Sequence, residues 1–510
     1  MKAIIYLVIL ACFMQQAQAQ IQWQHCYGGT GNDECSAIRA TFDGGYILAG
    51  YTGSNNGDVS GYHGPRDFWV VKISTTGAIE WQKCYGGSSD DWAYDIRQTA
   101  DSGYIVAGYT YSNDGDVTGN HGGEDAWVIK ISPFGILQWQ KCFGGSGNDY
   151  AGSVVQTSAG EYIVAATTNS NDGDVSGNHG GDDAWVLKLT DTGTIVWARC
   201  FGGSSWDFGY SVQETFDGGF IVGGTSYSND GEVTGHHGDT TTDDMWVVKL
   251  SVSGSLVWEK SLGGSDWDFG GETIQTMDSG YIVAGSAGSV DGDVTGHIGG
   301  CYSCGPQGLN GWVVKLSNGG TIQWDKCIYV YGNDRVVPLF QTGDGGYIFA
   351  GNARPYIGNS NALFGKLSGS GGIEWIDTLG GSSGNTWLGS GEPTNYGSGI
   401  AAGSTSANDG DVSGNHGGED YWVVKFGWPT GVSMNDENGG LIIKPNPADN
   451  YLSITATEVI TDISITNMVG QMVWKSNQLS SVSYKIDISE LPVGMYFVKI
   501  NGIATGKFLK

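Results

Sequence analysis

A Gly-rich acidic loop recurs along the chain and is the strongest candidate for chemistry. One copy reads Ser-Asn-Asp-Gly-Asp-Val-Thr-Gly-Asn-His-Gly-Gly-Glu-Asp over residues 112–125, and similar stretches follow in other parts of the sequence. Hard cations take several oxygen ligands from turn-forming loops that contain glycine, so the pattern predicts calcium as a cofactor. The alternative is structural, with Asn and Asp side chains capping the turns of a long loop. The candidate metal ligands are Asp114, Asp116, Asp172, Asp174, Asp409 and Asp411.

Histidines occupy one position in successive copies of this loop. We expect each to form a hydrogen bond within its own loop, because histidines in separate copies do not converge on one ion. A transition-metal site is the alternative. The residues are His63, His121, His179, His237 and His416, with His297 displaced by one position in a further copy.

The cysteines fall into repeated and unique positions. Equivalent positions in neighbouring repeats are too far apart for a disulfide, so the repeated cysteines are expected to be small buried hydrophobic residues. Cys301 and Cys304 differ, because they lie in an insertion that only one repeat has. In an exported protein this pair predicts a local disulfide, and the alternative, zinc, needs two further ligands. The repeated cysteines are Cys26, Cys84, Cys142, Cys200 and Cys327.

Catalysis needs an asymmetric set of side chains, whereas most polar residues here are repeated. No nucleophile elbow, zincin helix or phosphate-binding loop occurs in the sequence. The repeat becomes irregular in its last three copies, so a specific ligand site is expected there, although decay of the repeat without function explains the irregularity equally well. The candidate ligand-binding residues are Arg354, Tyr356, Trp387 and Glu392.

These residues are positioned by a repeating unit. Seven tryptophans in an I-x-W-x-K pattern run from Trp23 to Trp375, which is 352 residues over six steps, or about 59 per repeat. Each repeat predicts four short strands, and Asp-Gly turns such as residues 43–44 favour a tight hairpin between the first two. Four strands per repeat are typical of a β-propeller. We predict an all-β fold, a seven-bladed β-propeller with four-stranded blades, in which residues 21–26 complete the blade ended by residues 421–426.

The chain is strongly acidic. It holds 24 Lys and Arg against 53 Asp and Glu, for a formal net charge of −29. A field of this sign opposes binding to nucleic acid and to anionic lipid. The charge lies in the repeat region, because residues 431–510 hold seven acids and six bases, a balance of −1.

Both ends of the chain are predicted to direct export. Lys2, an apolar run and Ala17-Gln18-Ala19 predict a signal peptide over residues 1–19, with lipidation at Cys12 as the alternative. No later segment is long and apolar enough for a transmembrane helix. After a linker at 428–440, alternating residues predict a small β-sandwich domain over 441–510.

Residues 441–510 resemble the type A C-terminal sorting domain of Bacteroidetes proteins exported by the type IX secretion system. The matching segments are 444–447, 467–473, 488–496 and 506–510. The resemblance implies the type IX secretion machinery as partner, with the protein secreted or attached to the outer cell surface after export to the periplasm. Residues 20–427 resemble β-propeller repeats of secreted bacterial proteins, which share no single activity.

The sequence therefore predicts a secreted or cell-surface propeller that is a non-catalytic module binding a glycan or a surface protein. The alternative is a glycan-active hydrolase or lyase that uses carboxylates on the loop face of the propeller. Paired carboxylates for such a reaction are not identifiable from the sequence, so we favour binding over catalysis.

Overall fold

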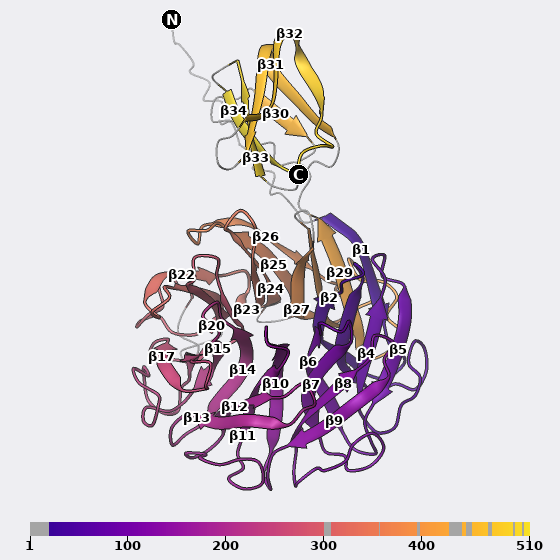
Figure 1. Ribbon diagram of the computed structural model, residues 1–510, viewed down its shortest axis with the longest axis vertical. Coiled ribbons are helices and arrows are strands. Elements are labelled where there is room, and N and C mark those ends of the chain that lie inside the picture. The colour runs from indigo at the N-terminus through magenta and orange to yellow at the C-terminus, as the bar shows by residue number, and fades with distance from the viewer. Residues whose placement is uncertain are drawn as a thin grey trace, which may run out of the picture. The chain divides into compact units, whose positions relative to one another are not determined.

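The four-stranded repeats form the sheets of a propeller in a computed structural model (Figure 1). The structure describes residues 20–299, 308–355, 358–394, 398–427, 441–444, 451–467, 472–492, 495–501 and 504–510. The chain divides into a propeller unit, residues 21–426, and a C-terminal unit that contains residues 427–510. The predicted signal peptide 1–19, the linker 428–440, the Cys301–Cys304 disulfide and Tyr356 lie outside the described residues.

Each blade is an antiparallel sheet that follows chain order from the centre outward, and the first strands β2, β6, β10, β14, β23 and β27 gather around the middle of the propeller in Figure 1. Blades one to three comprise β2 (Asp33–Ala40), β3 (Tyr46–Thr52), β4 (Asp67–Ile73), β5 (Ile79–Tyr85); β6 (Asp91–Gln98), β7 (Tyr104–Thr110), β8 (Asp125–Ile131), β9 (Leu137–Phe143); and β10 (Asp149–Gln156), β11 (Tyr162–Thr168), β12 (Asp183–Leu189), β13 (Ile195–Phe201).

The later blades are less regular, because the first strand of blade five is split into two short strands. Blades four to six comprise β14 (Asp207–Glu214), β15 (Phe220–Ser226), β16 (Asp244–Leu250), β17 (Leu256–Leu262); β18 (Asp268–Phe269), β19 (Thr273–Gln275), β20 (Tyr281–Ala287), β21 (Asn310–Leu316), β22 (Ile322–Ile328); and β23 (Gly332–Gln341), β24 (Tyr347–Pro355), β25 (Asn361–Leu367), β26 (Ile373–Leu379).

Blade seven joins the two ends of the propeller sequence. It consists of β27 (Thr386–Thr394), β28 (Ser398–Thr405), β29 (Asp420–Gly427) and β1 (Gln20–Tyr27), with β1 beside β29. The Trp422 indole N–H donates to Gln24 Oε1 at 2.9 Å across this pair. The predicted closure of the ring by the first strand is confirmed, and it covers the edge that β29 would otherwise expose.

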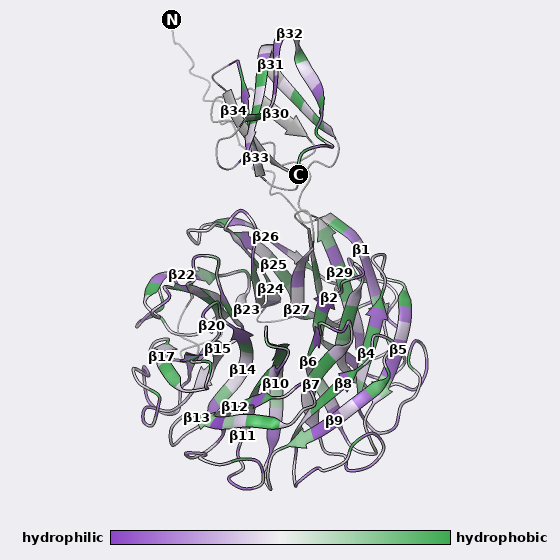
Figure 2. Cartoon of the chain, in the orientation of Figure 1, coloured by the Kyte–Doolittle hydropathy of each residue, from purple (hydrophilic) through white to green (hydrophobic). Residues whose placement is uncertain are grey.

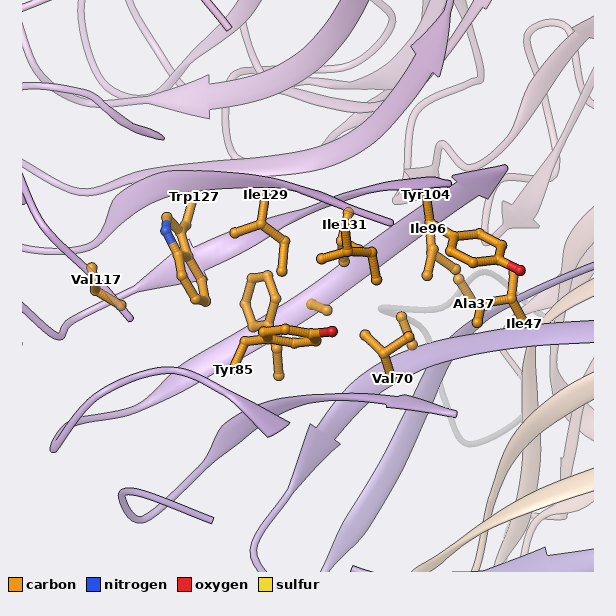
Figure 3. Packing of buried hydrophobic residues seen from close by; sticks show 14 of the residues in the cluster. Ala37, Ile47, Val70, Tyr85, Ile96, Tyr104, Val117, Trp127, Ile129 and Ile131 are labelled. Carbon is orange, nitrogen blue, oxygen red and sulfur yellow. The ribbon is translucent and has the colours of Figure 1, made fainter. Parts of the chain in front are cut away.

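The core lies between blades. Hydrophobic residues follow the strands while the loops are hydrophilic (Figure 2). Trp127, Ile129 and Ile131 of blade two pack with Val70 and Tyr85 of blade one (Figure 3). The six third-strand tryptophans are at most 1% exposed, and the repeated cysteines are buried free thiols, as predicted.

The C-terminal unit is also all-β. Its five strands form one sheet in which the two longest strands pair through several irregularities. Leu452, Ile465 and Val498 belong to its apolar core. The strands are β30 (Leu441–Lys444), β31 (Tyr451–Asn467), β32 (Met472–Asp487), β33 (Met495–Ile500) and β34 (Ala504–Leu509).

Candidate ligand-binding site

A β-bulge in the first strand of the blades directs side chains into a central channel. In blade one, Cys35 pairs with Gly50 and Ala37 pairs with Ala49, so Ser36 is the additional residue. The same irregularity occurs in blades two, three, four and seven. Bulges of this kind turn side chains away from their regular direction. The channel encloses a cavity of about 290 Å³ that is lined by first strands of all seven blades.

Blades seven, one, two and three fill their side of the channel with an ion-pair network. Asp95 accepts hydrogen bonds from Arg39 Nη2 at 2.7 Å, Arg97 Nε at 3.3 Å and Ser153 Oγ at 3.0 Å. Glu392 Oε1 lies 3.6 Å from Arg39 Nε and 4.0 Å from Arg97 Nη1. Burial opposes ionisation of Asp95, but the Arg97 and Arg39 guanidinium groups lower its pKa overall. The charges on this side are therefore matched within the protein.

Blades five and six have irregular first strands on their side of the channel. The first strand of blade five is interrupted at residues 270–272, and that of blade six has one additional residue between Val336 and Leu339. Arg335 lines the cavity and remains solvent-accessible there. Among the residues that the structure describes, no carboxylate forms an ion pair with it. Burial lowers the pKa of Arg335, and the nearby Tyr210 opposes this shift.

A chain of aromatic rings leads from the surface of blade four to this side of the channel. Tyr227 lies edge-to-face with Trp206 at 5.7 Å and with Trp267 at 5.8 Å between ring centroids. Phe208 contacts Tyr227 at 6.4 Å and stacks on Tyr210 at 5.9 Å. Trp206 is 52% exposed, and Tyr210 lines the cavity. We call Trp206, Phe208, Tyr210, Tyr227, Trp267 and Phe269 the aromatic row.

Trp206 and Trp267 replace a structural asparagine of the repeat. In blade three the equivalent Asn148 accepts a hydrogen bond from the Glu124 amide at 3.2 Å, which ties neighbouring loops together. Asn32 does the same for the Glu419 amide. The tryptophans in blades four and five do not supply this amide oxygen, so large exposed aromatic surface stands where a capping group would serve the fold.

A second aromatic group, on blades one to three, already holds a cation of the protein. The Arg66 guanidinium lies 5.0 Å from the ring centroid of Tyr51 and 5.6 Å from that of Trp92. In such cation–π contacts the guanidinium interacts with the faces of the aromatic rings. In the aromatic row the outermost ring, Trp206, is 52% exposed, whereas Tyr51 and Trp92 lie against the Arg66 guanidinium.

The predicted calcium ligands cap loop backbone. Asp114 Oδ1 accepts from the Ser88 amide at 2.7 Å, and Asp172 Oδ1 accepts from the Ser146 amide at 2.7 Å. Asp409 accepts from the Ser383 amide at 3.0 Å. Asp116 and Asp411 accept more weakly from glycine amides, and the Asp174 amide donates to Gly144 O.

These caps use carboxylate oxygens that a cation would need. Within the described part of the chain, no three His, Cys, Asp or Glu residues are gathered as a metal ion requires. The contacts fit the capping interpretation, and calcium binding stays a prediction.

The loop histidines bind a buried aspartate that opens the third strand of their blade. His121 Nδ1 lies 2.6 Å from Asp125 Oδ2, and His179 Nδ1 lies 2.6 Å from Asp183 Oδ2. The same contact occurs at His63, His237 and His416. The predicted structural hydrogen bonds are confirmed.

These aspartates face the carboxylate that opens the first strand of the next blade, and both are buried. Burial and the Asp244 charge raise the pKa of Asp268 to about 7, despite hydrogen bonds from Ser289. Burial likewise raises the pKa of Asp183 to about 6, although His179 lowers it. The blade junctions thus hold carboxyl groups that titrate near neutral pH.

The structure separates the predicted ligand residues. Glu392 joins the ion-pair network through Arg39 and Arg97, whereas Arg354 is exposed near the end of β24. Trp387 is half-buried on β27 and pairs with Ser404. Their role in binding a ligand stays a prediction.

Sequence reasoning missed Arg39, Asp95, Arg97 and Arg335. A signal existed, because Asp95 stands where blades three and four have Ser153 and Ser211, and such departures mark side chains that serve the channel rather than the repeat. Comparing the first strands position by position would have found them.

The C-terminal residues 443–509 match the family described as Secretion system C-terminal sorting domain. This region is a type IX secretion sorting domain. It implies recognition by the type IX machinery and a location outside the cell or at its outer surface. No helix in the described residues is long and apolar enough to cross a membrane. No match to a curated protein was found.

Several solved structures resemble the chain at low identity. PorZ of Porphyromonas gingivalis, described as an essential bacterial surface component of the type IX secretion system, matches at 12% identity and a TM-score of 0.41. The match covers 95% of this chain and 60% of PorZ, so this chain spans less than two thirds of that protein. Sqt1 of Chaetomium thermophilum matches at 10% identity and a TM-score of 0.42, covering 80% and 100% of the two chains. The Pan2 WD40 domain of Neurospora crassa matches at 10% identity and 0.42, covering 77% and 89%.

Proposed function

We propose that the propeller is a non-catalytic binding module that the sorting domain carries to the cell exterior, and that its ligand is a glycan held by the aromatic row. The observation that carries this proposal is the exposure of Trp206 at a position where blades one and three place a capping asparagine. Exposed aromatic rings present large, rigid and amphipathic contact area at low entropic cost. Sugar rings have apolar faces that suit such a surface.

Binding is favoured over hydrolysis by the state of the channel carboxylates. A glycosidase needs one carboxyl group with a raised pKa to act as general acid. The two arginines instead lower the pKa of Asp95, and Glu392 lies beside the same arginines. These two groups are therefore suited to holding arginines in place.

The test is a glycan array with the full chain, followed by a reducing-sugar assay on every glycan retained. We expect retention without new reducing ends, and loss of retention in Trp206→Asn, which restores the residue type of Asn148. Phe216→Ser is the matched control, because Phe216 is 72% exposed but belongs to a hairpin outside the aromatic row. New reducing ends would establish the hydrolase or lyase alternative. Retention of no glycan would reject the proposal and direct attention to protein ligands.

A further inference from the structure

The cavity beside the aromatic row contains an arginine that pairs with no carboxylate among the described residues. The cavity lining includes Arg39, Arg97 and Arg335 together with the carboxylates of Asp95 and Glu272. Arg39 and Arg97 are paired with Asp95 and lie near Glu392. The charge of Glu272 contributes to the raised pKa of Arg97. For Arg335, the described part of the chain shows no ion pair of this kind.

Arg335 lies inside the channel and keeps access to solvent, so an anion that enters the channel can reach its guanidinium. Arg335 has five N–H donors in a planar fork that matches a carboxylate in a bidentate arrangement. Desolvation by the surrounding protein lowers its pKa, as expected for a cation without a counter-charge.

The charge of the chain and the size of the cavity restrict which anions can bind to Arg335. The net charge of −29 repels polyanions from the whole surface. A single carboxylate on an otherwise neutral molecule meets less of this repulsion. The cavity volume of about 290 Å³ is at the lower end of small-molecule sites, which suits one sugar residue rather than a large ligand.

Arg335 and the aromatic row share one residue. Tyr210 lines the cavity with Arg335 and stacks on Phe208 at 5.9 Å, so the stacking surface continues to the guanidinium. We propose that the site binds an acidic saccharide, with Arg335 pairing to the carboxylate of a hexuronate and the aromatic row supporting the sugar rings. This inference rests on the proposed function and specifies its ligand class.

The experiment is isothermal titration calorimetry of the full chain with a trisaccharide that carries a single galacturonate residue, with the methyl ester of that trisaccharide and with inorganic sulfate. We expect the acid to bind about 10- to 100-fold more tightly than the ester, which is the usual range for a charge-assisted hydrogen-bonded pair. Arg335→Gln is expected to reduce affinity for the acid to that of the ester. Arg199→Gln is the control, because Arg199 is an exposed arginine on the outer strand β13 and is expected to leave the preference unchanged.

Equal affinity of the wild-type chain for acid and ester, or an acid preference that survives in Arg335→Gln, would overturn this inference. In either case loss of both sugars in Trp206→Asn would leave the proposed function standing. Sulfate binding as tight as binding of the acidic trisaccharide would also overturn it, because the site would then be a general anion site. Absence of binding of every glycan on the array would instead reject the proposed function itself.

Discussion

The two sides of the channel differ in whether the protein satisfies its own functional groups. On blades seven, one, two and three, Asp95 pairs with Arg39 and Arg97, and Arg66 covers aromatic rings. On blades four to six, Arg335 has no carboxylate partner among the described residues and Trp206 faces solvent. In a propeller of seven similar blades, a ligand site is expected where individual side chains differ from the repeat and are not paired with other groups of the protein.

The largest expected effect on stability comes from disrupting the ion-pair network of blades seven, one, two and three. Asp95→Ala leaves the partly buried Arg39 and Arg97 without their shared carboxylate and with Glu392 still beside them, so we expect the free energy of unfolding to fall by about 2–3 kcal/mol. Arg335→Gln on the open side removes a charge that had no partner and is expected to change it by no more than about 0.5–1 kcal/mol. Urea unfolding of both full-length variants measures the contrast. Equal losses would show that the two sides do not differ as described.

A second effect depends on pH and comes from buried carboxyl groups at the blade junctions. Burial, together with Asp268 and Asp244, raises the pKa of Asp243 to about 7, against the usual 3.8, and the pKa of Asp268 is also about 7. In blades two and three, Asp91 and Asp183 have values of about 6. The native state therefore binds more protons than the unfolded chain between about pH 4 and 7.

Stability is thus expected to rise as pH falls from 8 towards 4, and to be lost as pH rises through the native pKa values. Asp243→Asn removes one of these groups, so we expect it to stabilise the propeller by roughly 1–3 kcal/mol at pH 8 and to have little effect near pH 4. Thermal unfolding at the two pH values measures this. A wild-type melting temperature that falls steadily on acidification over this range would contradict the prediction.

The smallest expected effect is one that both sides share. Buried lysines Lys72 and Lys315 lie 3.0 Å from Asp43 and Asp278 in the hairpins of blades one and five. Burial opposes ionisation, but the Thr41 and Lys72 bonds, and their counterparts in blade five, lower both aspartate pKa values to about 2. These pairs therefore add stability above about pH 4 that is lost as pH falls towards 2.

Because both carboxylates are more than half exposed, Asp43→Asn and Asp278→Asn are each expected to cost about 0.5–1 kcal/mol at pH 7 and less at pH 2, where the carboxyl groups are partly protonated. Asp43→Asn is expected to cost the less of the two, because Glu80 still pairs with Lys72. Matched denaturation curves at the two pH values provide the measurement, and costs that do not shrink at pH 2 would contradict the prediction.

The fold was predictable because each strand type carries its own marker. Trp127 identifies a third strand by sequence alone, and its burial follows from its apolar neighbours. Closure of blade seven by the first strand was predictable too, because the repeat count left one extra strand at the start of the propeller and one missing from its last blade.

The candidate site was predictable only in part. Glu392 was identified by its irregular surroundings, but its contacts with Arg39 and Arg97 depend on bulges and on three blades meeting at the centre. Arg335 was missed because its importance depends on having no carboxylate partner among the described residues. This can be recognised only when the positions of the neighbouring side chains are known. The exposed Trp206 was overlooked for a related reason, since tryptophan elsewhere in the repeat is a core residue.

The last strand pairing of the propeller has a consequence for the order of events in the cell. Gln24 and Trp422 are 398 residues apart, so blade seven cannot be completed until almost the entire repeat region has been synthesised. Until then β1 has no partner strand, and its open edges are a site for unwanted pairing with other chains. The sorting domain follows β29 in the sequence. A chain that has a complete sorting domain therefore already contains every strand needed to close the propeller. A chain that ends within the repeat region lacks the sorting domain.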